Sequence, residues 1–229
     1  MHSIQYQNAA SLASERSEFI RKVYMNLALG FAGFIALEAF LVTWQPAVDL
    51  AQRMVSGNNW LIVLLAFMGV SWLANSWAAA GATLGKQYAG FALYIIAEAI
   101  IFLPLIIFAN SFAPDTIPQA GIITAALTAG ISAYAFFSKK DFSFMGSFLT
   151  IASFVALGII ACAVLFGIQL GLWFSAAMIV FAGLVILYQT SVMIRRYRND
   201  QYVAAALGLF AAIALMFWYI LQFLISSRR

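Results

Sequence analysis

Apolar residues occupy seven long runs of this chain, separated by short segments rich in Gly, Pro, Asn, Gln and charged residues. The runs cover residues 23–43, 60–80, 88–109, 118–137, 144–166, 170–194 and 202–226. A helix needs about 20 mostly apolar residues to cross the hydrocarbon layer of a bilayer, and each run has about that length. The pattern therefore predicts seven membrane-spanning helices, and the short connections make consecutive helices neighbours.

The closed β-barrel is the other structure that satisfies backbone hydrogen bonds inside lipid, but its strands alternate apolar and polar residues. Residues 100–108 are apolar throughout and show no alternation. We therefore expect an all-α fold, a polytopic membrane protein with a seven-helix bundle. Residues 19–229 would form this single transmembrane domain. The polar residues 1–18 would form a cytoplasmic tail, which we expect to be disordered.

The composition also indicates a membrane protein. Hydrophobic residues make up 65% of the chain and charged residues only 9%, whereas a soluble domain has about 25% charged residues. So few charges could not coat a soluble domain of this size. The net charge of +4 comes from cations that flank the apolar runs. It therefore indicates contact with the lipid bilayer and its headgroups, and no binding of nucleic acid is expected.

Lysine and arginine are divided unevenly between the two sets of connections. If the N-terminus is cytoplasmic, nine cations lie inside, namely Arg16, Arg21, Lys22, Lys86, Lys139, Lys140, Arg195, Arg196 and Arg198. Three lie outside, namely Arg53, Arg228 and Arg229. Short cytoplasmic segments have an excess of Lys and Arg. We therefore expect a cytoplasmic N-terminus, and a bacterial inner (plasma) membrane is the expected location.

Two glutamates interrupt the apolar runs. Glu98 lies near the middle of residues 88–109, with Tyr94 one helical turn earlier on the same face, and Glu38 lies in the outer half of residues 23–43. A charged side chain in the middle of a bilayer costs about 3 kcal/mol on insertion scales, so each acid is a candidate proton or cation site. The alternative is a neutral carboxyl group that only hydrogen-bonds a neighbouring helix. Glu38 is the weaker candidate because we expect it to reach the interface more easily.

Other polar chemistry is sparse. Gln189 lies near the cytoplasmic end of residues 170–194, where it could line a water-filled mouth. The chain has one histidine, His2, and one cysteine, Cys162, so a zinc site or a Cys-His nucleophile is not expected. Paired carboxylates or a nucleophile with its base cannot be assembled from these residues. We therefore expect no enzyme activity, no metal site and no cofactor.

Small residues recur at every fourth position in two of the runs. They are Gly121, Ala125, Ala129 and Ala133 in the first, and Ala204, Gly208 and Ala212 in the second. Such stripes let helix backbones approach closely inside a membrane. We therefore expect the helices at residues 118–137 and 202–226 to pack at the centre of the bundle, and helix packing without a pore is enough to explain both stripes.

The connection at residues 136–146 resembles the Lys/Arg-Asp-Phe-Ser signature of the Bax inhibitor-1/YccA family. Its central residues are Lys139, Lys140, Asp141, Phe142 and Ser143. Residues 98–104, 186–191 and 202–210 are also similar to the pattern of that family. The resemblance extends over nearly the whole chain, and it implies a seven-helix fold with a central hydrophobic helix and a cytoplasmic N-terminus.

For several members, the resemblance implies a pH-sensitive calcium leak that depends on two aspartates, one on each of the last two helices. Two close carboxylates cannot both ionise cheaply, so they share a proton and pH becomes a switch. This sequence has Gln189 at the first of these positions and Ala212 at the second. The aspartate pair is therefore absent, and a leak would have to depend on Glu98.

The resemblance leaves two functions open. The bacterial YccA branch also looks to lack the full pair, and that branch is associated with modulation of the membrane protease FtsH. A regulatory role in stress response, with FtsH as a partner, is therefore the first expectation. The alternative is a pH-sensitive leak for calcium or other cations, or for protons, with an altered site. The polar residues 1–18 favour the regulatory role slightly.

Overall fold

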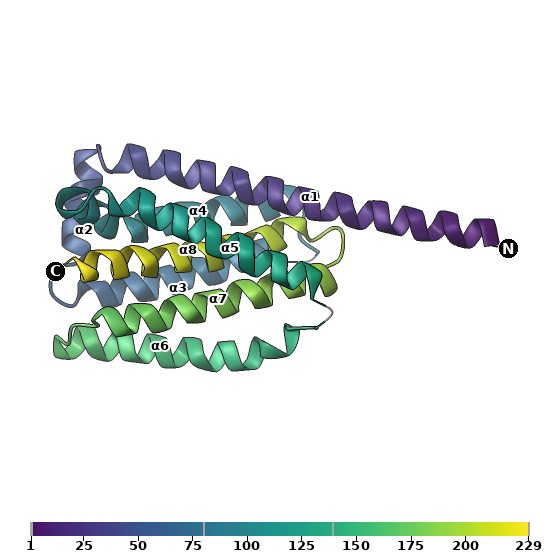
Figure 1. The fold of residues 1–229 in the computed structure, drawn as a ribbon. Helices are drawn as coiled ribbons and strands as arrows, with labels where there is room; N and C mark the ends of the chain where they lie inside the picture. The colour runs from purple at the N-terminus through teal and green to yellow at the C-terminus, as the bar shows by residue number, and fades with distance from the viewer. Residues whose placement is uncertain (1, 80, 139, 229) are drawn as a thin grey trace.

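The computed structural model describes residues 2–79, 81–138 and 140–228, with side chains at Leu12 and from Ser14 onward. The elements in chain order are α1 (His2–Leu41), α2 (Gln45–Met54), α3 (Asn59–Ala78), α4 (Leu84–Phe112), α5 (Thr116–Phe137), the 3₁₀ helix η1 (Ser143–Met145), α6 (Gly146–Phe166), α7 (Leu172–Arg195) and α8 (Tyr202–Ser227). Figure 1 shows the long helices running side by side in one bundle. Within the described residues, seven helices are long and apolar enough to cross a membrane.

The seven predicted spans are confirmed, and most of their ends differ from the prediction by only a few residues. The long apolar stretch from residue 144 to residue 194 is divided at Gly167, directly after α6. Gly167 has a φ of 66°, a left-handed conformation that glycine adopts without a clash of Cβ. The N–H of Ile168 then donates to the carbonyl oxygen of Ala163 at 2.8 Å. The chain turns there, and α7 runs back beside α6.

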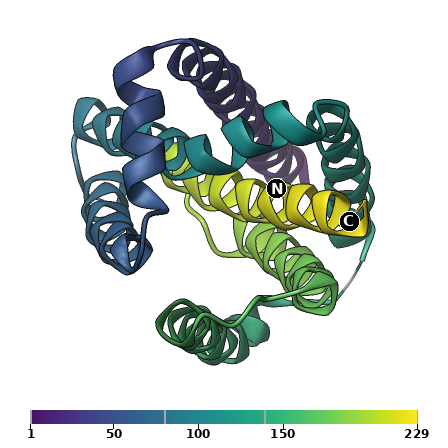
Figure 2. The same cartoon turned by 90° about the vertical axis from the view of Figure 1, so that its left-hand side faces the viewer.

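The last helix, α8, is the centre of the bundle. Its side chains are buried along most of its length, and Figure 2 shows the other long helices around it. The ring centroid of Phe210 lies 4.6 Å from that of Phe31 in α1 and 6.2 Å from that of Tyr94 in α4. The central position expected for this helix is therefore confirmed.

The matching expectation for α5 is wrong. Its small-residue stripe faces outward, since Gly121 is half-buried and Ala125, Ala129 and Ala133 are exposed. The buried residues of α5 are Thr116, Ala120, Thr124, Ser132 and Ala135. A four-residue repeat defines one face of a helix but not the neighbour toward which that face turns. Here the face with the threonines and the serine packs inward, and the small apolar residues are left toward the lipid.

The N-terminal segment is helical, whereas we expected a disordered tail. α1 begins at His2, so residues 2–18 continue the first membrane-spanning helix without a break. Figure 1 shows this part of α1 projecting beyond the rest of the bundle. The segment contains neither Pro nor Gly, and extending an existing helix by a residue is far easier than nucleating a new one.

The connection after α1 contains a helix that the hydropathy pattern did not predict. In α2, Pro46 lies in the first turn, where its missing N–H costs no hydrogen bond. Ala47, Ala51 and Met54 recur on one face and are buried. With 10 residues, α2 is too short to span a bilayer, and it packs across α4 and α3 at the end of the bundle.

Candidate functional site

Most of the cations of the connections lie at one end of the bundle, which we call the basic end. Lys86 and Lys140 lie there near the starts of α4 and α6, and Arg195 and Arg196 lie there at the end of α7. Lys22, midway along α1, completes this end, with its Nζ 5.5 Å from the ring centroid of Tyr202 at the start of α8. The other end, which we call the opposite end, contains α2 and the last residues of α8. The two ends therefore differ strongly in charge, as the uneven division of cations along the sequence predicted.

A cavity of about 1110 Å³ lies between α3, α4, α6, α7 and α8. Its wall includes Val55, Gly57, Gly167 and Ser226, which lie at the opposite end. From there it extends inward to Glu98, midway between the first and last residues of α4. Its described lining includes none of the residues that define the basic end. The cavity therefore reaches from the opposite end to the middle of the bundle.

Glu98 and Tyr94 both line this cavity, so they lie on one face of α4, as their spacing of one helical turn predicted. The exposed fraction is 5% for Glu98 and 7% for Tyr94. Within the described residues, Oε2 of Glu98 has no hydrogen-bond partner. The lining contains no Lys, Arg or Asp as far as the structure describes it. The chain thus presents one buried carboxyl group to the cavity and provides no cation there to pair with it.

Glu38 does not belong to this site. It lies on α1, about one turn before the end of that helix, and no described residue of α1 lines the cavity. We expected this acid to reach the interface, but the structure buries it to 6% exposure. Neither of its carboxyl oxygens has a hydrogen-bond partner among the described residues. The two intramembrane acids therefore have separate surroundings.

Gln189 is half-buried and packs against Gly208 in the interface between α7 and α8, outside the described lining of the cavity, so its place in a water-filled mouth stays a prediction. A Cβ atom added at Gly208 would lie 2.8 Å from Oε1 of Gln189, so the glycine leaves room for this amide. Ala212 lies one turn further along α8 and is 2% exposed. These are the positions at which the resembled family has its aspartates. The structure brings both to the same pair of helices, where this chain has an amide and a methyl group.

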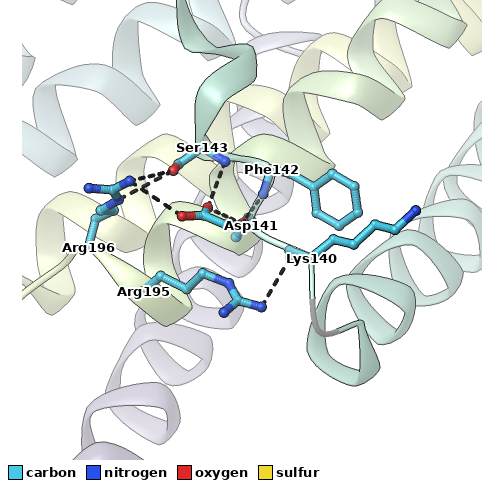
Figure 3. Close-up of polar contacts among 7 residues, drawn as sticks. Lys140, Asp141, Phe142, Ser143, Arg195 and Arg196 are labelled. Carbon is cyan, nitrogen blue, oxygen red and sulfur yellow. Dashed lines mark hydrogen bonds and ion pairs between the residues drawn. The ribbon is translucent and has the colours of Figure 1, made fainter.

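The connection between α5 and α6 is held against the end of α7 by three charged residues, Asp141, Arg195 and Arg196, which we call the loop latch (Figure 3). Asp141 accepts a hydrogen bond from the backbone N–H of Ser143 at 2.9 Å and pairs with Arg196 at 3.3 Å. Arg195 donates to the carbonyl oxygen of Lys140 at 3.0 Å. The latch therefore joins two segments that are about 55 positions apart.

The other residues of the predicted loop motif differ in their roles. The backbone N–H of Phe142 donates to Oγ of Ser191 at 3.0 Å, and this bond is buried. The side chain of Lys140 is exposed, and Figure 3 shows it pointing away from Asp141. Lys139 lies outside the described residues. Of the three motif residues that we singled out, Asp141 therefore makes the side-chain contacts that hold the loop.

Asp141 makes the loop latch sensitive to acid. Hydrogen bonds from Ser143 lower the pKa of Asp141 below its usual value, and the nearby charge of Arg196 lowers it further. The ionised carboxylate therefore stabilises the folded loop above the unfolded pKa of about 3.9. This contribution is lost as the pH falls through the lower folded pKa.

We expect Asp141→Asn to speed amide exchange in residues 138–146 at neutral pH and to remove the acid-dependent part of that exchange. Hydrogen exchange measured between about pH 3 and 7 tests this. Asp49→Asn, on the exposed side of α2 at the opposite end, is the matched control and should leave the loop unchanged. An Asp141→Asn loop that exchanges like the wild type at every pH would contradict the latch.

Arg16 covers the end of α7 from the side of α1. Its guanidinium donates to the carbonyl oxygens of Met193, of Ile194 at 2.7 Å and of Tyr197 at 2.9 Å. It also lies 4.3 Å from the ring centroid of Phe19. Carbonyls in the last turn of a helix have no intrahelical partner, and a cation there is favoured by the helix dipole. We counted Arg16 only as an orientation charge, because no local pattern links it to residues so distant in the sequence.

Known proteins resemble this chain over most of its length. A sequence model of the family described as "Inhibitor of apoptosis-promoting Bax1" matches residues 16–229. An uncharacterized protein of Pseudomonas aeruginosa is 29% identical, over 97% of this chain and 96% of that protein. The Golgi anti-apoptotic protein of Vaccinia virus is 27% identical, over 93% of this chain and 87% of that protein. Protein LIFEGUARD 3 of Arabidopsis thaliana is 24% identical, over 92% and 85%.

Proposed function

Because this chain belongs to the Bax inhibitor-1 family of multi-pass membrane proteins, we propose that it is a pH-sensitive cation leak that works without covalent chemistry. The observation that supports this proposal is the position of Glu98. The only acid in the described lining is Glu98, which is buried midway along α4 in the inner part of a cavity that begins at the opposite end. A buried acid that faces a cavity is a typical element of ion and proton paths in membranes.

The described lining of the cavity does not extend to the basic end. Between Glu98 and the basic end, α7 and α8 pack closely, with Gln189 against Gly208. At the basic end itself, Arg16 and the loop latch tie α1 and the α5–α6 connection to the end of α7. A leak therefore requires α7 to move relative to α8 and these ties to open, which makes the basic end the gate of the proposed path.

The pH sensitivity of the proposed path would come from Glu98. The other titratable groups in the described lining are the phenols of Tyr94 and Tyr219, while the lining residues from α3, α6 and α7 are not titratable. Phenols ionise at about pH 10, so Glu98 is the group whose charge changes nearest to neutral pH.

Calcium prefers six to eight oxygen ligands, so a single carboxyl group would make at most a weak, transient calcium site, as conduction requires.

We expect Glu98→Gln to reduce calcium flux to the level of empty vesicles and to abolish its pH dependence. The measurement is uptake into dye-loaded proteoliposomes between about pH 6 and 8, where a buried carboxyl group can titrate. Glu38→Gln is the matched control, because it removes a buried acid that does not line the cavity, and its flux should equal that of the wild type. Wild-type vesicles that take up calcium no faster than empty ones would refute the leak.

A second function, regulation of a partner protein, is favoured by the projection of α1. The helix extends past the bundle at the basic end as far as His2, and a projecting helix is available for contact with another protein. We propose that the protein lies in a bacterial inner membrane with the basic end facing the cytoplasm, where a membrane protease such as FtsH would be an accessible partner. Removal of residues 2–13 should then abolish co-purification with FtsH and leave calcium flux unchanged. A truncated chain that binds FtsH as before would contradict this role.

A further inference from the structure

We propose that the cavity binds a lipophilic organic cation, with the positive charge beside Glu98 and the apolar body against the aromatic wall. This inference goes beyond the proposed function, because a ligand of this kind can bind whether or not any ion crosses the membrane. It depends on the charge, the lining and the size of the cavity.

Glu98 is the only acidic residue in the described lining of the cavity. Glu98 is 5% exposed, and its Oε2 has no hydrogen-bond partner among the described residues. The described lining includes no Lys, Arg or Asp. Burying a carboxylate without a partner is costly, and an opposite charge placed beside it offsets part of that cost. A ligand with one positive charge therefore fits the site better than a neutral or anionic ligand.

The lining is suited to a cation with an apolar body. Its aromatic residues include Trp60, Tyr94, Phe102 and Trp218. The ring centroids of Phe102 and Trp218 are 4.9 Å apart in an edge-to-face contact, and those of Trp60 and Trp218 are 6.1 Å apart in a stacked contact. Aromatic faces attract cations and also bind apolar groups.

The size of the cavity excludes a bare metal ion as its best ligand. Its volume of about 1110 Å³ is slightly above the usual range for small organic ligands, about 300 to 1000 Å³. The hydroxyl groups of the lining include those of Ser71, Ser153 and Ser175, which come from three different helices. One carboxyl group among such scattered oxygens cannot surround a calcium ion with six to eight ligands. An organic cation needs only one such contact.

The test uses tetraphenylphosphonium as the probe, measured by equilibrium dialysis against the purified full chain in an uncharged detergent at about pH 8. We expect Glu98→Gln to weaken binding about tenfold or more, which corresponds to the loss of about 1.4 kcal/mol. Glu38→Gln should bind the probe as the wild type does. The wild-type affinity should fall on acidification, as Glu98 gains a proton, and the Glu98→Gln affinity should not.

Two outcomes would overturn the proposal. One is binding to Glu98→Gln as tight as to the wild type. The other is equally tight binding of triphenylphosphine oxide, a neutral analogue, which would show simple partition into an apolar cavity. Thermal unfolding of each variant shows whether it is folded. Trp218→Leu gives a second readout, because the loss of an aromatic side chain from the cavity wall should also weaken binding of the probe. Calcium flux without probe binding overturns this inference alone, and probe binding without flux overturns only the leak.

Discussion

Gly90→Ala is expected to destabilise the bundle by about 3 kcal/mol, as overpacking of a close contact does. Gly90 lies where α4 crosses α3, and a Cβ atom added there would be 2.6 Å from the carbonyl oxygen of Ala74 and 2.9 Å from Cβ of Trp77. The atoms that it meets belong to or adjoin the backbone of α3, so no flexible side chain can move aside. The two helices would have to separate at their crossing, and both of them line the cavity.

Thermal unfolding of the detergent-purified protein measures this effect. Gly85→Ala is the matched control, because Gly85 is on the same helix and an added Cβ would have nothing within 4 Å. We expect Gly85→Ala to change stability by no more than about 0.5 kcal/mol. If the two variants unfold at the same temperature, α3 and α4 do not approach each other closely at Gly90.

Arg16→Met is expected to cost about 2 kcal/mol of stability, as for the loss of hydrogen bonds to a charged group. Its guanidinium bonds the carbonyl oxygens of Ile194 and Tyr197 at 2.7 and 2.9 Å. Methionine keeps most of the apolar stem, but it removes the guanidinium that lies over Phe19 and leaves the final carbonyls of α7 without this donor. Because the loop latch is anchored on the same helix end, we also expect faster amide exchange at residues 193–199.

Arg21→Met separates this effect from a general loss of positive charge. Arg21 is exposed on the same helix, so its replacement should change stability by no more than about 0.5 kcal/mol. Hydrogen exchange and thermal unfolding of the two variants decide the question. If Arg16→Met unfolds as Arg21→Met does, Arg16 is only one of the cations that flank the membrane and not a cap of α7.

Much of the candidate site could be predicted from local patterns. Glu98 and Tyr94 were assigned to one face of a helix because residues four apart always share a face. An acid in the middle of an apolar run also points to function without any knowledge of its neighbours. The sequence could not show that this face borders a cavity, since four further helices form the rest of the wall.

The orientation of each helix about its own axis was the least predictable feature. The stripes of α5 and α8 follow the same rule of small residues, yet one faces outward and the other lies at the centre. In lipid, apolar side chains suit both the outside and the inside of a bundle, so hydropathy does not tell the two faces apart. The burial of Glu38 could not be predicted for the same reason. It depends on the helices around α1 and not on how far Glu38 lies from the end of its apolar run.

The sequence by itself determined the seven membrane-spanning helices and the charge difference between the two ends of the bundle. These follow from the length of each apolar run and from the position of each cation, which are properties of short segments. Only the tertiary structure decided that Glu98 faces a cavity, that Glu38 lies apart from it, and that Arg16 and Asp141 hold the end of α7. Those contacts join residues that are about 50 to 180 positions apart, and their existence depends on how whole helices pack.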